Sequence, residues 1–448
     1  MSLNLTEAQI IQLAPDAASV KAGKGLAGKN KWVLLEYSDR AVWGHCQGSG
    51  KLPYQTVVDL KEIAFKCSCP SRKFPCKHGL GLLLLYAAHP EEFRQSDEPE
   101  WVASWLSKRV EKAEKREQKA KSETSGALVD EVAQAKRSAM RHQKIMNGLD
   151  DLEMWMNDLL RNGLINVPER AYNLFDGMAR RMVDAQAPGL AGRLKAMQDI
   201  GFHRDEWKYE LADRLGKLFL LIQGYKHLDM LSAEWKDEIR TQVGFPQSKE
   251  EVLAGEAVYD DWVVLHKMSQ QVNDLNTDTY WLLGCRNKRY AIFLSFTPKG
   301  RVHEINLLPG SVYSGALYFY KGAGLLRRAV FKDFTLSGDV GHSKLSFCAC
   351  LKDAASEYRN MVISNPFIEN VPLLVENVHF ALQGTKFCVQ DKAGDIYPVS
   401  LLEDMRIDIL AITGGKPFSA FFLADAGCWE LKSIWYQSEY HTWRDERD

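Results

Sequence analysis

The stretch of residues 66–85 reads Lys-Cys-Ser-Cys-Pro-Ser-Arg-Lys-Phe-Pro-Cys-Lys-His-Gly-Leu-Gly-Leu-Leu-Leu-Leu. It holds four soft metal ligands, Cys67, Cys69, Cys76 and His78, in the pattern C-x-C, six residues, C-x-H. Three thiolates and one imidazole form a tetrahedral Zn²⁺ set that leaves no position open for water, which is typical of structural rather than catalytic zinc. The sequence therefore predicts one structural zinc ion and a local fold built around it.

The residues around these ligands indicate how the chain brings them together. The first two cysteines would point to one side of an extended strand, but too far apart to share an ion unless the chain turns. Pro70 follows them directly and favours such a turn. The other two ligands stand at the start of the apolar run Gly79–Leu85, where free N–H groups of a helix N-terminus stabilise thiolate charge. We expect a β-hairpin to lead into the site and a helix to leave it.

Alternating segments before the ligands predict strands, and the apolar segment after them predicts a helix. The expected strands are Trp32–Tyr37, Ala41–Cys46, Tyr54–Leu60 and Ile63–Lys66, and the expected helix is Leu80–Ala88. A second helical segment, Glu91–Lys108, is expected to place Trp101 and Trp105 on one face.

Glycine and proline mark the expected loops of this N-terminal part. Lys21–Lys31 is punctuated by glycine and is expected to be a basic loop. Gln47–Lys51 has a superficial likeness to a phosphate-binding loop, but Pro53 argues against a helix after it, so we expect a hairpin turn. Near the N-terminus, Thr6 and Gln9 can form the capping box of a short helix.

The length of 448 residues exceeds one ordinary core, and changes in composition suggest the domain boundaries. We expect a zinc-binding domain over residues 1–107, a charged linker over 108–126, a helical domain over 127–250 and a β-rich domain over 251–448. The expected fold class is multidomain α+β, with an N-terminal β-hairpin/helix zinc module, a helical middle domain and a β-rich C-terminal domain.

The helical domain is predicted from apolar residues that recur with the helical period. One such stripe is Ile145, Leu149, Leu152, Met156 and Leu159, and a second is Trp207, Leu211, Leu215, Leu218 and Ile222. Pro188-Gly189 is expected to separate two helices within Ala179–Leu194.

The C-terminal part changes to the shorter period of strands. A hairpin is predicted from Tyr280–Cys285 and Tyr290–Phe296. Further strands are expected at Val312–Tyr320, Val330–Phe334, Val371–Leu382, Phe387–Val389, Ile407–Ile412 and Ala420–Leu423. No internal repeat is recognisable at the periods of solenoids or propellers.

Charge and cysteine content limit the classes of protein. The net charge is −1, but residues 20–80 carry eleven Lys/Arg against four Asp/Glu, so the N-terminal part is locally basic. Nine cysteines, an odd number in a long chain, do not fit a disulfide framework.

The N-terminus lacks the features of a signal peptide and no apolar run is long enough to span a membrane. We expect a protein of the reducing cytoplasm.

The pattern C-x-C-x6-C-x-H, after a hairpin and before a Leu-rich helix, resembles the SWIM zinc finger. The longer stretches Cys46–Tyr54 and Phe65–His78, together with Ala179–Leu190, are similar to bacterial SWIM-domain proteins of about this length. The resemblance implies that the four ligands bind zinc and that the finger binds DNA or protein. These bacterial proteins are often encoded beside a MoxR-type AAA+ ATPase and a von Willebrand A-domain protein, which implies both as partners.

The function that we expect is that of a non-enzymatic zinc-binding adaptor that works with these two partner proteins. The alternative is nucleic-acid binding through the basic finger, with phosphates contacted by Lys24, Lys29, Lys31, Arg72, Lys73 and Lys77. Trp32, Trp43 or Phe74 would then be available for base stacking. The same charges could instead keep the domain soluble and offset the anionic zinc core.

An enzymatic C-terminal domain is the third hypothesis. Cys348 and Cys350 with His342 could form a second metal or redox site, but the apolar run Leu345–Leu351 fits a buried strand better. His379 with Cys388, or Asp184 with Arg180, could form catalytic pairs, but pairing residues along a sequence is weak support for a site. Because no catalytic constellation can be assembled, we expect that the protein is not an enzyme.

Overall fold

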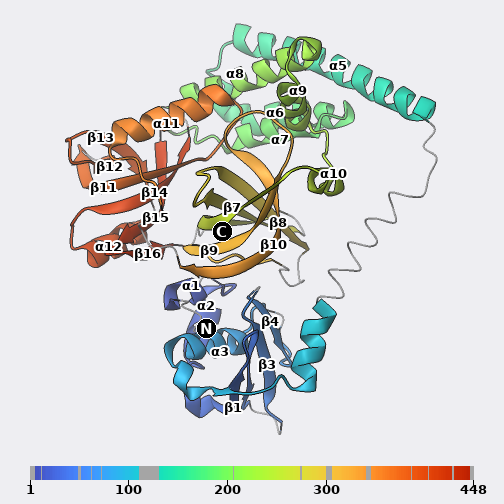
Figure 1. Cartoon of the computed structure of the whole chain (residues 1–448). Coiled ribbons are helices and arrows are strands. Elements are labelled where there is room, and N and C mark those ends of the chain that lie inside the picture. The colour runs from blue at the N-terminus through green and yellow to red at the C-terminus, as the bar shows by residue number, and fades with distance from the viewer. Residues whose placement is uncertain are drawn as a thin grey trace.

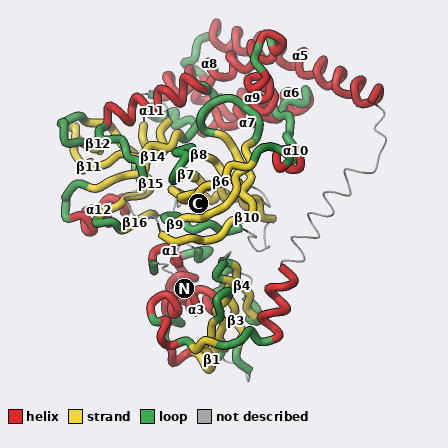
Figure 2. The backbone as a smooth tube through the Cα atoms, in the orientation of Figure 1, coloured by secondary structure: helices red, strands yellow, loops and turns green. Residues whose placement is uncertain are grey.

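A computed structural model describes residues 6–109 and 131–443, apart from gaps at 12, 49–51, 62, 72, 205, 273–274, 299–304, 340–344, 385, 402 and 426–427. Figure 1 shows the N-terminal unit in blue at the bottom, a β-barrel above it, helices at the top and a second β-structure on the left. Figure 2 shows the same division between helical and stranded parts. Among the described helices, none is both long and apolar enough to cross a membrane.

The N-terminal unit combines a five-stranded sheet with helices packed against it. Its sheet has the order β4-β3-β2-β1-β5, and residues 100–109 add a further helical segment. The elements are α1 (Glu7–Ile11), α2 (Ala17–Lys24), the 3₁₀ turn η1 (Lys29–Lys31), β1 (Trp32–Tyr37), β2 (Ala41–Cys46), β3 (Tyr54–Asp59), β4 (Ala64–Cys67), α3 (Lys77–Ala88), η2 (Pro90–Glu92) and β5 (Arg94–Gln95). The four predicted strands and the capping box are confirmed, since Gln9 N donates to Thr6 Oγ1 and Thr6 N to Gln9 Oε1.

The prediction of a basic loop over Lys21–Lys31 is wrong in its first half, where α2 extends to Lys24. Asp16 caps this helix by accepting a hydrogen bond from Ser19 N at 2.7 Å. A Cβ on Gly23 would lie 2.9 Å from Leu80 Cβ, so this glycine permits close packing of α2 on α3 rather than a loop. The predicted helix Glu91–Lys108 is also shorter than expected, because it begins only at residue 100.

The middle region is helical, as predicted, and every residue of the two predicted stripes is buried. Its long helix α5 packs against α6 and α8 around one apolar core. Its elements are α5 (Glu131–Arg161), α6 (Val167–Asp184), α7 (Pro188–Ala196), η3 (Met197–Asp199), α8 (Trp207–Lys226), η4 (Leu228–Met230), α9 (Ala233–Val243) and α10 (Lys249–Leu253). The charged linker falls on residues outside the described part, except for 108–109, which are helical.

The C-terminal region begins with a closed five-stranded barrel, hereafter barrel 1. Its strands are β6 (Ala257–Val272), β7 (Leu275–Gly284), β8 (Tyr290–Pro298), β9 (Ser311–Phe319) and β10 (Arg327–Asp339). The long β6 pairs with β9 through its first half and with β7 through its second, while β8 and β10 run parallel. This connectivity is that of a five-stranded Greek-key barrel, whose interior is filled here by side chains such as Trp262 and Tyr280.

The second β-structure, hereafter barrel 2, repeats this connectivity. Its elements are α11 (Leu351–Ser364), β11 (Val371–Gln383), β12 (Lys386–Gln390), β13 (Ile396–Ser400), α12 (Glu403–Thr413), β14 (Phe418–Asp425), β15 (Cys428–Tyr436) and β16 (Glu439–Thr442). The long β11 pairs with β14 and then with β12, and β13 runs parallel to β15, as β8 does to β10. A repeat that is not recognisable in the sequence is therefore present in the strand pairing.

Two predicted strands of barrel 2 are wrong. Ile407–Ile412 lies in α12, where the buried residues Met405 and Ile409 are four apart and so share one helix face. The run Leu345–Leu351 forms no strand, because only Cys348 makes an isolated bridge and Leu351 begins α11. The remaining predicted C-terminal strands are confirmed, although β7 and β10 are several residues longer than predicted and β6, β13, β15 and β16 were not predicted.

Specific contacts join the N-terminal unit and the helical region to the barrels. Leu308 of barrel 1 is buried in the N-terminal core with Ile10, and Gln9 Nε2 donates to Ser311 Oγ at 3.1 Å. On the helical side, the buried Glu238 accepts a hydrogen bond from Ala323 N at 3.3 Å. The N-terminal unit therefore packs on one part of barrel 1, and the helices pack on another.

Candidate metal centre

The structure brings the four predicted ligands together. Strand β4 ends at Cys67, the chain bends at Cys69, and Cys76 occupies the N-cap of α3. His78 lies in the first turn of that helix and is 5% exposed. The four ligand atoms all lie within 4.8 Å of one another. A hairpin therefore supplies one ligand, a bend the second, and a helix start the remaining two.

The distances within the cluster fit a tetrahedral zinc site. A Zn–S bond of about 2.3 Å and a Zn–N bond of about 2.0 Å place sulfur and nitrogen ligands roughly 3.5 Å apart. Nδ1 of His78 lies 3.7 Å from the sulfur of Cys67 and 4.0 Å from that of Cys76. These two distances exceed the ideal separation by only a few tenths of an ångström. All four positions are taken by protein atoms, so the set has no place for a reactive water.

The thiols of the site differ in acidity before any metal binds. The pKa of Cys76 is lowered to about 4, first by a hydrogen bond from the Cys67 side chain, with His78 and the Gly79 N–H also contributing. The pKa of Cys67 is raised, first because its sulfur is the donor to Cys76 and then because it is buried. The thiol at the helix N-terminus is therefore the more acidic of the two.

Neighbouring residues that the sequence did not point out shape the wall of the site. Thr56 Oγ1 lies 3.2 Å from Cys67 Sγ, and the ring of Tyr54 packs on that of His78 with centroids 4.9 Å apart. A Cβ on Gly79 would come within 2.8 Å of Phe65, so the glycine lets the helix start pack against this ring. Thr56 pairs with Cys67 in the β3–β4 hairpin. Knowledge of this register would have identified Thr56 as a neighbour of the zinc ligand.

The six cationic residues proposed as phosphate contacts are not equally available. Lys24 pairs with Glu7 at 2.8 Å, Lys73 with Asp16 at 2.6 Å, and Lys29 with Glu92. Lys31 and Lys77 are exposed. Burial raises the pKa of the nearby Cys46, and the charges of these two lysines oppose that shift. Arg72 lies outside the described residues. Half of the proposed cationic set is thus already paired with carboxylates of its own unit.

The aromatic residues proposed for base stacking are largely inside the unit. Trp32 is 8% exposed and Trp43 is fully buried, so neither ring offers a face to a ligand. Phe74 is partly buried and packs edge-on against Phe65 with centroids 6.1 Å apart. The assignment of Trp32 and Trp43 as stacking residues is therefore wrong.

The other candidate sites do not assemble in the described part of the chain. Cys348 Sγ donates to Glu357 at 3.1 Å, Cys350 occupies the N-cap position of α11, and His342 lies outside the described residues. Cys388 is fully buried opposite Ala381 rather than His379. Arg180 pairs with Asp176 at 2.7 Å, not with Asp184. Among the described residues, the Cys₃His cluster is the one group with metal-ligand geometry.

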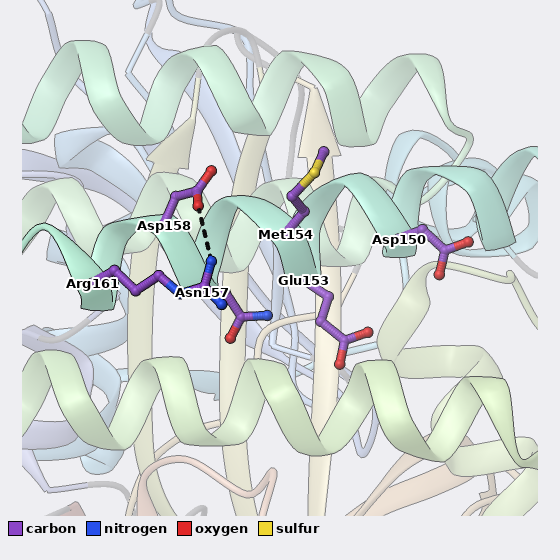
Figure 3. Close-up of a pocket in the computed structure, with 6 residues that line it drawn as sticks. All are labelled: Asp150, Glu153, Met154, Asn157, Asp158 and Arg161. Atoms are coloured by element: carbon purple, nitrogen blue, oxygen red, sulfur yellow. Dashed lines mark ion pairs between the residues drawn. The ribbon is translucent and has the colours of Figure 1, made fainter.

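A surface cavity of about 280 Å³ on α5 is lined by Asp150, Glu153, Met154, Asn157, Asp158 and Arg161. Figure 3 shows these side chains on one helix, with an ion pair between Asp158 and Arg161. Lys226 lies 2.6 Å from both Asp150 and Glu153, so their charges are compensated. This cavity is a solvated ion-pair network rather than a pair of carboxylates arranged for acid–base chemistry.

Comparison with known protein families agrees with the geometry. Residues 56–87 match the family model of the SWIM zinc finger, and residues 140–243 match that of the SWIM-associated four-helix bundle domain. The Cys₃His cluster in this segment binds one structural Zn²⁺, as predicted. No curated protein and no solved structure matches the chain.

Proposed function

We propose that the protein is a non-enzymatic adaptor in which the SWIM zinc finger is a rigid recognition module and the helical bundle and barrels hold it in place. The observation that carries this proposal is the closed site of three cysteines and one histidine, which can fix loops but has no free coordination position. The finger is tied to barrel 1 through Ile10 and Leu308. Its surface is therefore displayed at a defined angle to the rest of the chain.

Two features favour a protein over a nucleic acid as the ligand of the finger. Lys24 and Lys73 are engaged with carboxylates of the same unit, which lowers the local positive charge. Trp32 and Trp43 lie in the core and cannot stack with bases. An interface with another protein needs neither unpaired lysines nor exposed rings for base stacking.

The partners in this proposal are a MoxR-type AAA+ ATPase and a von Willebrand A-domain protein, on the basis of the resemblance to bacterial SWIM-domain proteins. The bundle exposes large apolar side chains that suit protein contact, among them Ile165 at 82% and Tyr172 at 66% exposure. These residues lie just before and within α6, inside the segment 140–243 that matches the SWIM-associated four-helix bundle domain.

Affinity capture of the full chain from its native host, with nuclease treatment, tests this proposal. We expect both partners to be captured after nuclease treatment, and the double variant Ile165→Lys with Tyr172→Lys to lose them. Leu382→Lys is the matched control, because Leu382 is 66% exposed on barrel 2. Capture of neither partner, or equal capture by both variants, contradicts the proposal.

Nucleic-acid binding by the finger is the second candidate function, favoured by the exposed Lys31 and Lys77, for which the described residues provide no ion pair. If this function holds, affinity for DNA falls steeply with added salt, because bound phosphates release counterions. The variant Lys31→Gln with Lys77→Gln then reduces both affinity and the salt dependence. Binding that is independent of salt contradicts this candidate.

A further inference from the structure

Three arginines gather with two aromatic rings at one end of barrel 1. Arg289 follows the β7–β8 turn, and its guanidinium carbon lies 4.3 Å from the ring centroid of Phe319. Arg327 lies 5.2 Å from the same ring, and Arg328 lies 5.0 Å from that of Tyr320. Arg289 of the β7–β8 loop and Arg327 of the β9–β10 loop thus meet on one ring. Arg328 and Tyr320, each one residue further along the chain, pack together on the opposite face of these strands at the same end of the barrel. We call these five residues the arginine cluster.

The guanidinium groups of this cluster have no protein acceptor. In the described part of the chain, none of the three arginines has an ion pair or a side-chain hydrogen bond. Arg286 in the same β7–β8 turn differs, because its Nε donates to Asp260 at 3.0 Å. An arginine offers five N–H donors in a planar fork, so this cluster presents many unused donors at the surface.

Like charges at this site repel each other. The pKa of Arg327 is lowered, first by burial and then by the neighbouring Arg289, although Glu238 of the bundle opposes this effect. Contacts with aromatic faces compensate such charges only weakly. Two half-buried like charges, opposed only by the carboxylate of Glu238, favour an anion that enters the site.

Barrel 2 provides an internal comparison, because it has the same connectivity without this chemistry. Its turn between β12 and β13 carries Asp391, Lys392 and Asp395, and β14 ends at Asp425. In barrel 1 the equivalent segments 285–289 and 320–328 carry six Lys/Arg and no Asp/Glu. The positive charge is therefore not a requirement of the barrel.

We propose that the arginine cluster of barrel 1 binds single-stranded nucleic acid, with Arg289, Arg327 and Arg328 on the phosphates and Tyr320 beside a base. A single strand offers both phosphates and free base faces, which match the two kinds of group in the cluster. The loop between the fourth and fifth strands of five-stranded Greek-key barrels is also a common place for oligonucleotide binding. This inference is independent of the adaptor function and locates nucleic-acid contact away from the finger.

The test uses the full chain and a fluorescein-labelled oligothymidylate, with binding followed by anisotropy at several salt concentrations. The variant R289Q/R327Q/R328Q is expected to bind at least tenfold more weakly. Its log–log salt slope should fall by about 2, since each lost phosphate contact removes about 0.7 for single strands. The control R161Q/R180Q/R359Q removes the same charge from exposed sites elsewhere and is expected to bind like the unaltered chain.

Further variants distinguish binding at the arginine cluster from binding at the finger and from attraction to any polyanion. Tyr320→Leu should weaken binding without changing the salt slope, because stacking involves no counterion release. If the triple variant fails to fold, the exposed Arg328→Gln alone should still reduce affinity and slope. The proposal is overturned if the oligonucleotide does not bind, or if both triple variants bind equally. It is also overturned if Lys31→Gln with Lys77→Gln accounts for the whole loss, or if polyglutamate competes as well as DNA.

Discussion

The zinc finger and the two barrels achieve stable folds by different means. In the finger, helix α3 packs against a short sheet. The four zinc ligands all lie within the segment Cys67–His78. The barrels close through pairings of distant strands, such as β6 with β9, and share a continuous apolar core. The finger therefore depends on one ion, whereas each barrel depends on many side chains that are buried together. This difference can be tested by removing the zinc ion or by truncating a buried side chain of the barrels.

Zinc removal should have the largest effect and should be confined to the finger. Structural zinc contributes about 10–16 kcal/mol in small fingers, which exceeds the stability of an ordinary domain. After chelation we expect amide hydrogen exchange to lose protection over residues 32–88, while residues 257–339 stay protected. Readdition of zinc is the control. Equal loss of protection in both regions would show that the barrels depend on the ion.

Cys76→Ser should reproduce much of this effect, because it leaves three ligands and removes the thiolate at the helix N-terminus. We expect less than about half an equivalent of bound zinc at neutral pH, measured by metal analysis of the purified protein. Cys46→Ser is the matched control, since Cys46 is fully buried beside the site but is not among the ligands. Full zinc content in Cys76→Ser would remove Cys76 from the ligand set.

Phe421→Ala should destabilise the barrels and leave the finger intact, which is the reverse of zinc removal. Phe421 is fully buried in the core shared by the barrels, and truncation of such a ring costs about 3–5 kcal/mol. We expect the barrels to unfold at lower denaturant concentration while zinc content stays unchanged. Leu382→Ala, at a position that is 66% exposed, should change stability by less than about 0.5 kcal/mol. Loss of zinc from Phe421→Ala would indicate that finger and barrels unfold as one unit.

The same difference accounts for what the sequence could predict. The zinc ligands, the hairpin before them and the helix after them were predicted because their chemistry is contained in neighbouring residues. Four strands of barrel 1 were also predicted, but neither β6 nor the closure of the barrel was, since the partner of β6 lies roughly fifty to sixty residues further along the chain. Ile407–Ile412 was misassigned because isoleucine favours strands, whereas its packing here is that of a helix.

Site residues outside the zinc cluster were harder to predict, because their availability depends on tertiary contacts. Nothing near Lys29 or Lys73 in the sequence indicates that Glu92 and Asp16 would pair with them. Trp43 is a plausible stacking residue by type, but the sheet buries it. The proximity of Arg327 to Arg289, which lie on the same ring of Phe319, follows only from barrel closure.

The smallest effect concerns Asp16, which supports the finger electrostatically. Its pKa is lowered to about 2 from 3.8, first by the hydrogen bond with Lys73 and then by those with Ser19. Since the folded-state value is the lower one, this contribution is complete above pH 3.8 and is lost as the pH falls toward 2. Because Asp16 is partly exposed, we expect Asp16→Asn to cost only about 0.5–1 kcal/mol after screening.

This prediction is measured as the difference in unfolding free energy between the unaltered chain and Asp16→Asn, both saturated with zinc. The difference should be constant from about pH 5 to 8, where the carboxylate is ionised in both folded and unfolded chains. Lys73→Gln in the same background should then add little, since the two residues form one pair. A difference that varies within this pH range would assign the stabilisation to another group, and the finger would then depend on more than its ion, its cap and this pair.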